Sequence, residues 1–236
     1  MKTIDYLFLF IASSLLFSCG KISPKGKIET KTVEVSDFSA VDLQGKFRVF
    51  YVKDPKTRIE LETYPNLMDN LDISVSDHVL KIHEKRGVKG VDFYNLTLYS
   101  QKDIQHISIS DSVEFNGSSE IKAEDFKLKI NKSAKFIGAI RTKKALVEMN
   151  NHALANIKGF SDEATFKLTD SASIIAPFWK VEILDLQANK NSYAEIGVDQ
   201  EIKGNLLNNA QLLYYNSPAL TIKKDKTTKV KNKIQP

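Results

Sequence analysis

Apolar and polar residues alternate along most of the chain after residue 30. Phe47 and Val49 are separated by one polar position, as are Ile107 and Ile109. A period of two is typical of a half-buried β-strand, whereas an amphipathic helix repeats its apolar residues every three or four positions. The exception is residues 64–71, where a proline suits a first helical turn. The pattern predicts an all-β protein.

From residue 103 onward the alternation itself repeats about every 20 residues. Apolar residues lie two and four positions before most of the repeated corner positions, and small or apolar residues lie two and four positions after them. The corners are Asp111, Lys132, Asn151, Asp170, Lys190 and Asn209, spaced 19 to 21 residues apart. Units that cannot bury an apolar face alone stack to share a continuous core. Asn, Asp and Ser suit such corners because they bond to the local backbone, and recurring asparagines can stack as an amide ladder.

We therefore predict a β-solenoid with coils of about 20 residues over residues 103–222, with a β-sandwich as the alternative. The polar residues Asn205 and Gln211 break the pattern in the last unit, and we interpret them as an atypical terminal cap. Residues 30–102 keep the alternation without the period. The corner pattern recurs at Asp77, 34 residues before Asp111. This N-terminal β portion is predicted to form wider coils or a small β-subdomain that caps the solenoid, because an open solenoid end exposes unpaired strand edges.

The first residues have the layout of a secretory signal: Lys2, an apolar stretch over residues 6–17, and small residues around a cysteine. The apolar stretch is short for a permanent membrane span. The segment Leu16-Phe17-Ser18-Cys19-Gly20 resembles the lipobox of bacterial lipoproteins. That resemblance implies a signal peptide over residues 1–18, lipidation of Cys19 after cleavage, and a tether over residues 19–29. The alternative is an ordinary signal peptide with a chance cysteine.

The lipobox resemblance also bears on location. Gly20 is not the Asp that typically retains lipoproteins in the inner membrane, which implies the outer membrane. The basic run from Lys21 to Lys27 differs from the acidic surface-export signals of Bacteroidetes. We therefore expect an outer-membrane lipoprotein that faces the periplasm rather than the cell surface. Cys19 is the only cysteine, so the mature chain has no disulfides.

The net charge of +5 at first favours nucleic-acid binding. However, residues 223–236 contain six lysines and one aspartate, which account for the whole excess, and the remaining chain is close to neutral. We therefore expect no nucleic-acid partner. The basic tail is interpreted as a solvated, disordered end. The alternative is a weak contact with anionic lipid or polysaccharide.

The sequence contains no recognisable catalytic or metal-binding motif. The spacing of its four histidines, at positions 78, 83, 106 and 152, is not that of metal ligands, so we expect neither a metal nor a cofactor. Asp111 and Asp170 share a corner column but lie three coils apart. At about 4.8 Å per coil they are too distant to act as a general acid–base pair on one sugar bond.

Two sets of residues are candidates for surface roles. The aromatic residues expected to be exposed and available to a ligand are Trp179, Tyr193, Tyr214 and Tyr215, although they could instead cover an end or pack on the tail. Ser112 and Ser171 each follow an aspartate and precede an aliphatic residue. This sequence resembles the O-glycosylation motif reported for Bacteroidetes.

The chain also resembles the auto-transporter adhesin, head GIN domain family of Bacteroidetes lipoproteins. Residues 35–49, with Phe38, Gly45 and Phe47, resemble the opening motif of that family. Residues 59–82 resemble its next segment, and the small-residue repeats over residues 103–220 resemble its second half. The chain departs from the family in having Asp77-His78 where an Asp-Gly turn is usual, and in having fewer glycines in the coils. The resemblance implies an adhesion-like role and transfers no catalytic residue.

The leading hypothesis is thus a non-enzymatic envelope lipoprotein that is held on a membrane by its lipid and binds a glycan, a peptide or another envelope protein. Two alternatives stay open. One is a carbohydrate-active β-helix enzyme. The other is a structural or assembly protein whose copies dock through coil ends.

Overall fold

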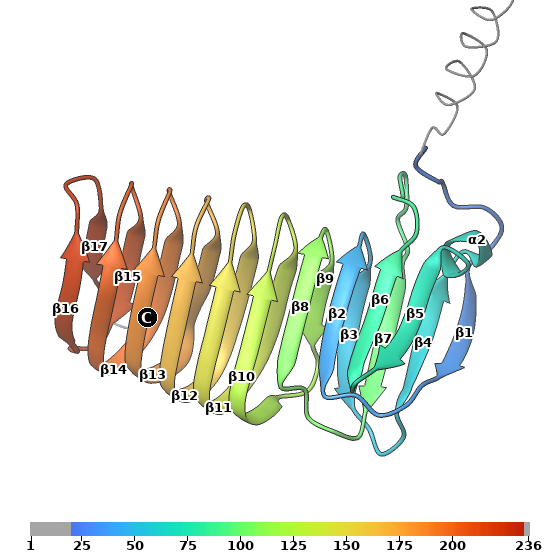
Figure 1. Cartoon of the computed structure of the whole chain (residues 1–236), viewed down its shortest axis with the longest axis horizontal. Coiled ribbons are helices and arrows are strands. Elements are labelled where there is room, and N and C mark those ends of the chain that lie inside the picture. The colour runs from blue at the N-terminus through green and yellow to red at the C-terminus, as the bar shows by residue number, and fades with distance from the viewer. Residues whose placement is uncertain (1–19, 234–236) are drawn as a thin grey trace, which may run out of the picture.

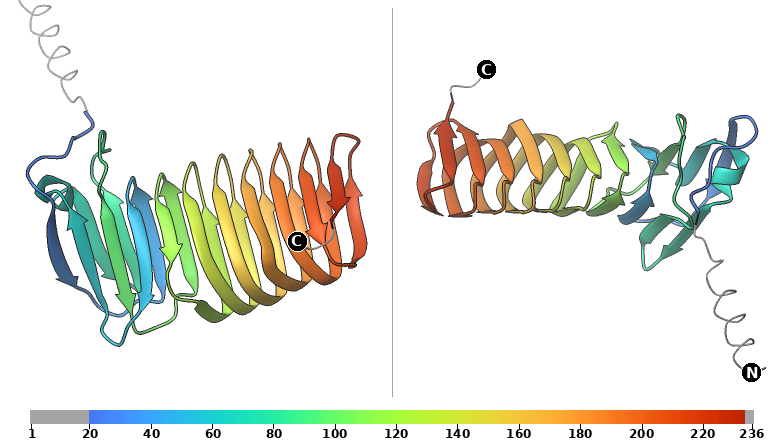
Figure 2. Two further views of the ribbon diagram at one scale, coloured as in Figure 1. Left: turned by 180° about the vertical axis from the view of Figure 1, so that it is seen from behind. Right: turned by 90° about the horizontal axis from the view of Figure 1, so that it is seen from above.

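The computed structural model describes residues 20–233, so the predicted signal peptide and Cys19 lie outside the described residues. The chain forms one elongated β-solenoid of about seven turns with coils of about 19 residues, which confirms the predicted fold class (Figure 1). The coils stack along one axis, and their tight corners line one long side of the molecule. The view from above shows that each coil is flattened into two facing layers (Figure 2).

The N-terminal end of the solenoid is closed by a small antiparallel cap. Strand β1 pairs with β4, β4 also pairs with β7, and β5 forms a hairpin with β6. The fully buried Leu67 of a one-turn helix fills the end of the core. Residues 30–102 thus contain features of both arrangements that the sequence left open, a cap and further coils of the solenoid. The elements of the cap are β1 (Glu29–Glu34), β4 (Arg58–Thr63), α2 (Pro65–Met68), β5 (Leu71–Ser76), β6 (Val79–Glu84) and β7 (Asn95–Ser100).

The order of coils in space differs from their order in the sequence at this end. Strands β2 (Ala40–Gly45) and β3 (Arg48–Lys53) form a coil that lies between two later ones. β2 pairs in parallel with β6 on one side and with β8 (His106–Asp111) on the other. β3 pairs in the same way with β7 and β9 (Glu114–Gly117). This coil therefore comes first in the sequence, but in space it lies between two coils formed by later residues.

The remaining coils follow in sequence order, and all of their strands pair in parallel. Each coil runs along one layer, turns at a tight corner, runs back along the other layer and passes through a wider bend. We call the layer before each corner the pre-corner face and the layer after it the post-corner face. The strands are β10 (Ile121–Ile130), β11 (Lys135–Met149), β12 (Leu154–Leu168), β13 (Ser173–Ala188), β14 (Tyr193–Leu206), β15 (Gln211–Tyr215), β16 (Ala219–Lys224) and β17 (Lys229–Asn232).

The core between the layers is built from columns of equivalent side chains. Phe115 stacks on Phe136, with ring centroids 5.4 Å apart and planes 12° apart. The corner end of the core is narrow, and small residues fill it in the coils that follow Val113. This fully buried column contains Ala134, Ala153, Ala172, Ser192 and Ala210.

The corners require left-handed backbone, which explains their composition. Asn151 has φ 59° and Asn208 has φ 53°, a region that Asn and Asp adopt more readily than other non-glycine residues. Asparagines at or beside the corners form two separate pairs of the kind predicted for an amide ladder. The Nδ2 group of Asn150 donates to Oδ1 of Asn131 over 2.8 Å. Asn208 donates to Asn189 over the same distance.

Glycine is required at one wider bend, at Gly159, and inside one pre-corner strand, at Gly204. A Cβ atom on Gly159, which has φ +125°, would lie 1.9 Å from the carbonyl oxygen of Ile140 on the neighbouring coil. A Cβ atom on Gly204, which has φ +135°, would lie 2.1 Å from the carbonyl oxygen of Leu186. Only a residue without a side chain allows the coils to approach this closely.

Three sequence-based expectations about the coils are wrong. The repeat between β14 and β15 shortens to 18 residues, because Tyr193 pairs with Gln211. The corner equivalent to Lys190 is therefore Asn208 and not Asn209. Asn205 and Gln211 broke the pattern because they were aligned one position out of register, so they do not form a terminal cap. Asp77 is not a solenoid corner. It forms, with His78, a two-residue hairpin turn in which both φ values are positive, and Gly45 pairs with Asp111 in the corner row.

The two ends of the described part of the chain are also more ordered than expected. The basic tail was predicted to be disordered, yet β16 and β17 form a further coil over residues 219–232. The predicted tether is bonded to the cap, because the amide of Ile22 donates to the carbonyl of Gly87 over 3.0 Å. At the C-terminal end, backbone hydrogen bonds to the preceding coil thus order a lysine-rich segment.

Candidate functional surface

Several polar groups of the pre-corner face are paired with one another. The ammonium of Lys167 lies 3.0 Å from a carboxylate oxygen of Glu148, and Lys127 approaches the other oxygen at 3.5 Å. The hydrogen bond from Lys167 holds the pKa of Glu148 below its usual value. Farther along, Asn205 donates to Gln187, which donates to Asp185. The pairing covers part of this face, since Lys129 and Lys203 are exposed and form no ion pair within residues 20–233.

The post-corner face is different, because it exposes a group of large apolar side chains on three adjacent strands. Ile137 is 53% exposed and Phe178 is 66% exposed. Ile137 and Ile175 lie in one row on either side of Asn156, and Leu154 occupies the next row of the middle strand. Single exposed apolar residues are common on protein surfaces, whereas a contiguous group marks an interaction site. We call Ile137, Leu154 and Ile175, together with Phe178 at the adjoining bulge of β13, the apolar strip.

A tyrosine–glutamate cluster borders the apolar strip on β14 and β15. Glu195 pairs directly with Ile175, so the two features are continuous. Its carboxylate accepts a hydrogen bond from the hydroxyl of Tyr193 over 3.0 Å and another from Tyr215. Burial, followed by the bond to Glu195, raises the pKa of Tyr193 to about 12. The bond to Glu195 is the main reason that the pKa of Tyr215 is also raised to about 12.

The predicted exposure of three aromatic residues is wrong. Trp179 is fully buried, packs on Phe166 and donates through Nε1 to Ser161 over 3.0 Å. The register of β13 shifts near Pro177, so the alternation reverses and Phe178 points outward instead. A proline inside a strand is a sequence signal of such a bulge, and it could have identified Phe178.

Tyr214 and Tyr215 are also buried, with 8% and 1% of their surfaces exposed. Tyr214 points inward because the repeat between β14 and β15 is one residue shorter than the pattern suggested. Tyr193 is half-buried and is the one member of the predicted set with a partly exposed side chain. Ligand contact by Tyr193 stays a prediction.

The corners place the other predicted residues along one polar ridge. Ser112 and Ser171 are both exposed there, and their O-glycosylation stays a prediction. The carboxylates of Asp111 and Asp170 each contact a lysine of the next coil, Lys132 and Lys190 respectively. Between residues 20 and 233, no group of three or more His, Cys, Asp or Glu side chains is arranged to hold a metal ion.

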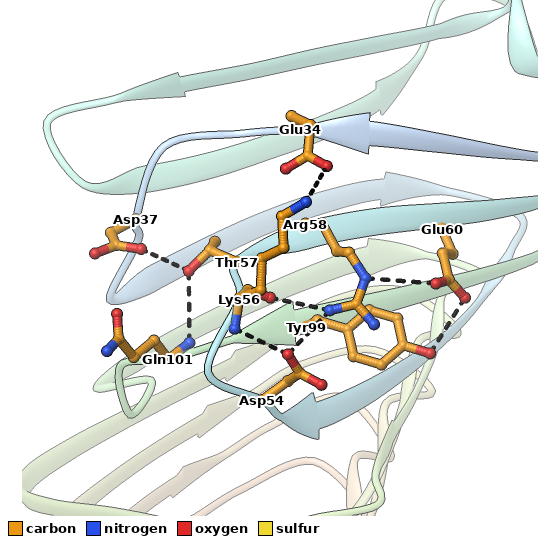
Figure 3. A network of polar contacts seen from close by, with 9 residues as sticks. All are labelled: Glu34, Asp37, Asp54, Lys56, Thr57, Arg58, Glu60, Tyr99 and Gln101. Atoms are coloured by element: carbon orange, nitrogen blue, oxygen red, sulfur yellow. Dashed lines mark hydrogen bonds and ion pairs between the residues drawn. The ribbon is translucent and has the colours of Figure 1, made fainter.

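A polar network in the cap is saturated by its own members (Figure 3). The guanidinium carbon of Arg58 lies 3.7 Å from the ring centroid of Tyr99. Arg58 also contacts Asp54 at 3.0 Å and Glu60 at 3.5 Å, and the Tyr99 hydroxyl donates to Glu60. Ion pairing and cation–π contact on one side chain fix β4 against β7. We assign this network a structural role.

No helix within the described part of the chain has the length and apolar character of a membrane span. The fold of the chain resembles several solved structures. A "putative adhesin" from Bacteroides fragilis superimposes with a TM-score of 0.77 at 15% identity, covering 90% of this chain and 100% of that chain. A "putative adhesin" from Parabacteroides merdae gives a TM-score of 0.69 at 19% identity, covering 90% and 99%. A "putative lipid binding protein" from Parabacteroides distasonis gives 0.69 at 17% identity, covering 90% and 100%.

These identities show a shared fold alone. Among curated proteins, none is significantly similar to this chain. The sequence of residues 37–218 matches the family described as "Putative auto-transporter adhesin, head GIN domain". That range includes the intercalated coil, most of the cap and the coils that carry the apolar strip. The chain belongs to this adhesin-like, head GIN domain family.

Proposed function

We propose that the protein is a non-enzymatic outer-membrane lipoprotein on the periplasmic side, and that it uses its apolar strip to bind a protein partner. The observation that carries the proposal is the contrast between the two faces. The pre-corner face carries paired polar groups around Glu148, whereas the post-corner face exposes Ile137, Leu154 and Ile175, with Phe178 exposed where β13 leaves that face. Burying a fully exposed side chain of this kind contributes roughly 1.5–3 kcal/mol, so even half-exposed residues provide several kcal/mol in total.

The composition of the apolar strip favours a protein over a glycan. Sugar rings stack on flat aromatic side chains, and Phe178 is the one aromatic member of the strip. Ile137, Leu154 and Ile175 are aliphatic, which suits the apolar centre of a protein–protein interface. The adjoining cluster around Glu195 supplies the polar rim that such interfaces have.

Anchoring is supported by the position of the lipobox cysteine. Cys19 immediately precedes Gly20, whose carbonyl accepts two hydrogen bonds from Arg86 of the cap. A lipid on Cys19 would therefore hold the cap end, and the regular coils extend away from that end. The test is mass spectrometry of the N-terminal peptide, together with fractionation of a Cys19→Ser variant. We expect acyl chains on the native cysteine and loss of the variant from the membrane fraction. An unmodified thiol in a membrane-bound protein would refute the anchor.

Partner binding is tested by site-specific photocrosslinking in the native cells. A photoreactive residue replaces Ile137 or Ile175 in one pair of variants and Thr165 of the pre-corner face in the matched control. We expect a discrete crosslinked protein from the strip positions alone, and its loss when Phe178→Asp is added. Equal crosslinking from both faces, or none, would contradict the proposal, and a crosslink to carbohydrate would favour the glycan alternative.

A further inference from the structure

Five basic side chains surround the point where the described chain begins. The amide of Lys89 donates to the carbonyl of Ile22 over 2.9 Å, and the backbone amide of Lys25 donates to the side chain of Asn66. Two nitrogens of Arg86 bond to the carbonyl of Gly20, at 3.2 and 2.6 Å. The same shallow hollow is lined by the basic residues Lys21, Lys25, Lys85, Arg86 and Lys89, which we call the anchor-side basic cluster.

The charges of this cluster are not neutralised within the protein. All five residues are exposed, and none forms an ion pair with a carboxylate of residues 20–233. Asp69 is the one acidic residue that lines the hollow, and Lys85 bonds to its backbone oxygen rather than to its carboxylate. Many solenoid lysines do have partners. Lys135, for example, lies 2.8 Å from Glu114, and Lys143 lies 2.6 Å from Glu124.

We propose that the anchor-side basic cluster contacts the anionic headgroups of the membrane that holds the protein. This inference rests on the proposed lipid anchor at Cys19. Consecutive Cα atoms are about 3.8 Å apart, so the Cα atom of Lys21 lies within about 8 Å of the Cα atom of Cys19. This distance is about one Debye length at physiological salt. The hydrogen bonds to Gly20 and Ile22 bring the cap residues Arg86 and Lys89 to the same level.

The consequence is a defined orientation of the protein on the membrane. A lipid tether alone permits the solenoid to tilt in any direction, whereas each basic residue near an anionic surface adds about 1 kcal/mol for one arrangement. The cap then lies against the headgroups. The second lysine-rich segment, residues 223–233, lies at the opposite end of the solenoid and stays away from the membrane.

The test is lysine footprinting of the native lipidated chain in two kinds of vesicle, phosphatidylcholine alone and phosphatidylcholine mixed with phosphatidylglycerol. An amine-reactive ester labels exposed lysines, and mass spectrometry measures the rate at each site. We expect labelling of Lys21, Lys25 and Lys89 to fall about fivefold in the anionic vesicles, as about 1 kcal/mol per residue requires. Lys158 in the middle of the solenoid and Lys231 at the far end are exposed and form no ion pair within residues 20–233, so as controls their rates should not change.

Each outcome has a distinct meaning. Equal labelling of the cluster in both vesicles would overturn the inference, and protection of Lys231 together with the cluster would show that the molecule lies flat. A paired variant, Lys21→Glu with Lys89→Glu, should lose the difference between the vesicles, whereas Lys158→Glu should keep it. A native chain that does not float with either vesicle would refute the lipid anchor itself, which separates failure of the proposed function from failure of this inference.

Discussion

The close approach of coils at Gly159 makes a quantitative prediction. In a Gly159→Ala variant, the new Cβ atom would lie 1.9 Å from the carbonyl oxygen of Ile140, far inside any normal contact, so the two coils must separate by about 1 Å. Separation breaks about two ladder hydrogen bonds at about 1 kcal/mol each. The backbone conformation at φ +125° adds about 1–3 kcal/mol of strain for a residue with a side chain. The free energy of unfolding should therefore fall by about 3–5 kcal/mol.

Two other glycines serve as matched controls. Gly90 has φ +62° but nothing within 4 Å of an added Cβ, so Gly90→Ala should lose only the left-handed penalty of about 1–2 kcal/mol. Gly87 has neither a positive φ nor a close neighbour, and Gly87→Ala should change stability by less than about 0.5 kcal/mol. This series separates a steric effect from the general cost of replacing glycine.

The assay is urea unfolding of the unlipidated protein, followed by circular dichroism and by fluorescence. Trp179 is the only tryptophan, it is buried, and it pairs directly with Gly159, so its emission reports on the affected coils. If Gly159→Ala proved no less stable than Gly90→Ala, the close packing of these coils would be wrong. If the fluorescence transition alone moved to lower urea, the coils would unfold separately, as repeat proteins can.

Three further predictions follow from the corners, the tyrosine cluster and the polar ridge. Asn150→Ala removes one rung of the amide ladder and should lower the free energy of unfolding by about 1 kcal/mol, measured by the same urea titration. The pKa values of Tyr193 and Tyr215 are raised to about 12, so the stabilisation from their protonated hydroxyls is present below pH 10 and is lost as the pH rises through about 12. The Glu195→Gln variant should shift the ultraviolet titration of both tyrosines towards the ordinary pKa of about 10. Because Ser171 is exposed, we expect a glycan mass on it in the native host, and Ser171→Ala should remove that mass.

The regular coils were predictable from sequence because their contacts repeat at a nearly fixed spacing. Each inward position from Phe136 onward has an equivalent one coil later. The alternation of inward and outward positions, counted from the corner, therefore identifies most of the core. The alternation fails where a residue is inserted or lost. The bulge beside Pro177 turned Trp179 inward, and the shortened repeat did the same to Tyr214. The apolar strip was not predicted, because an outward apolar residue such as Ile137 or Phe178 appears in the sequence only as an isolated exception to the alternation.

The cap was less predictable because its pairings are distant in sequence. Ala40 pairs with His106, 66 positions later, and no local pattern specifies that partner. The basic tail was misread for a different reason. Its lysine content is typical of a disordered end, but Leu212 of the previous coil offers an apolar position on which Val230 can continue the column.

The intercalated coil of β2 and β3 also constrains the order in which the protein can assemble. This coil is synthesised early but needs strands from both sides, and β8 and β9 are complete only at residue 117. If the chain emerges from a membrane pore with its N-terminus first, about half of it must therefore wait without its final neighbours. Contacts between distant segments form slowly because the intervening loop must first close. Beyond that point each coil can dock as it emerges, so formation of the first half should limit the rate of folding, and a chaperone would have to protect that half rather than the regular stack.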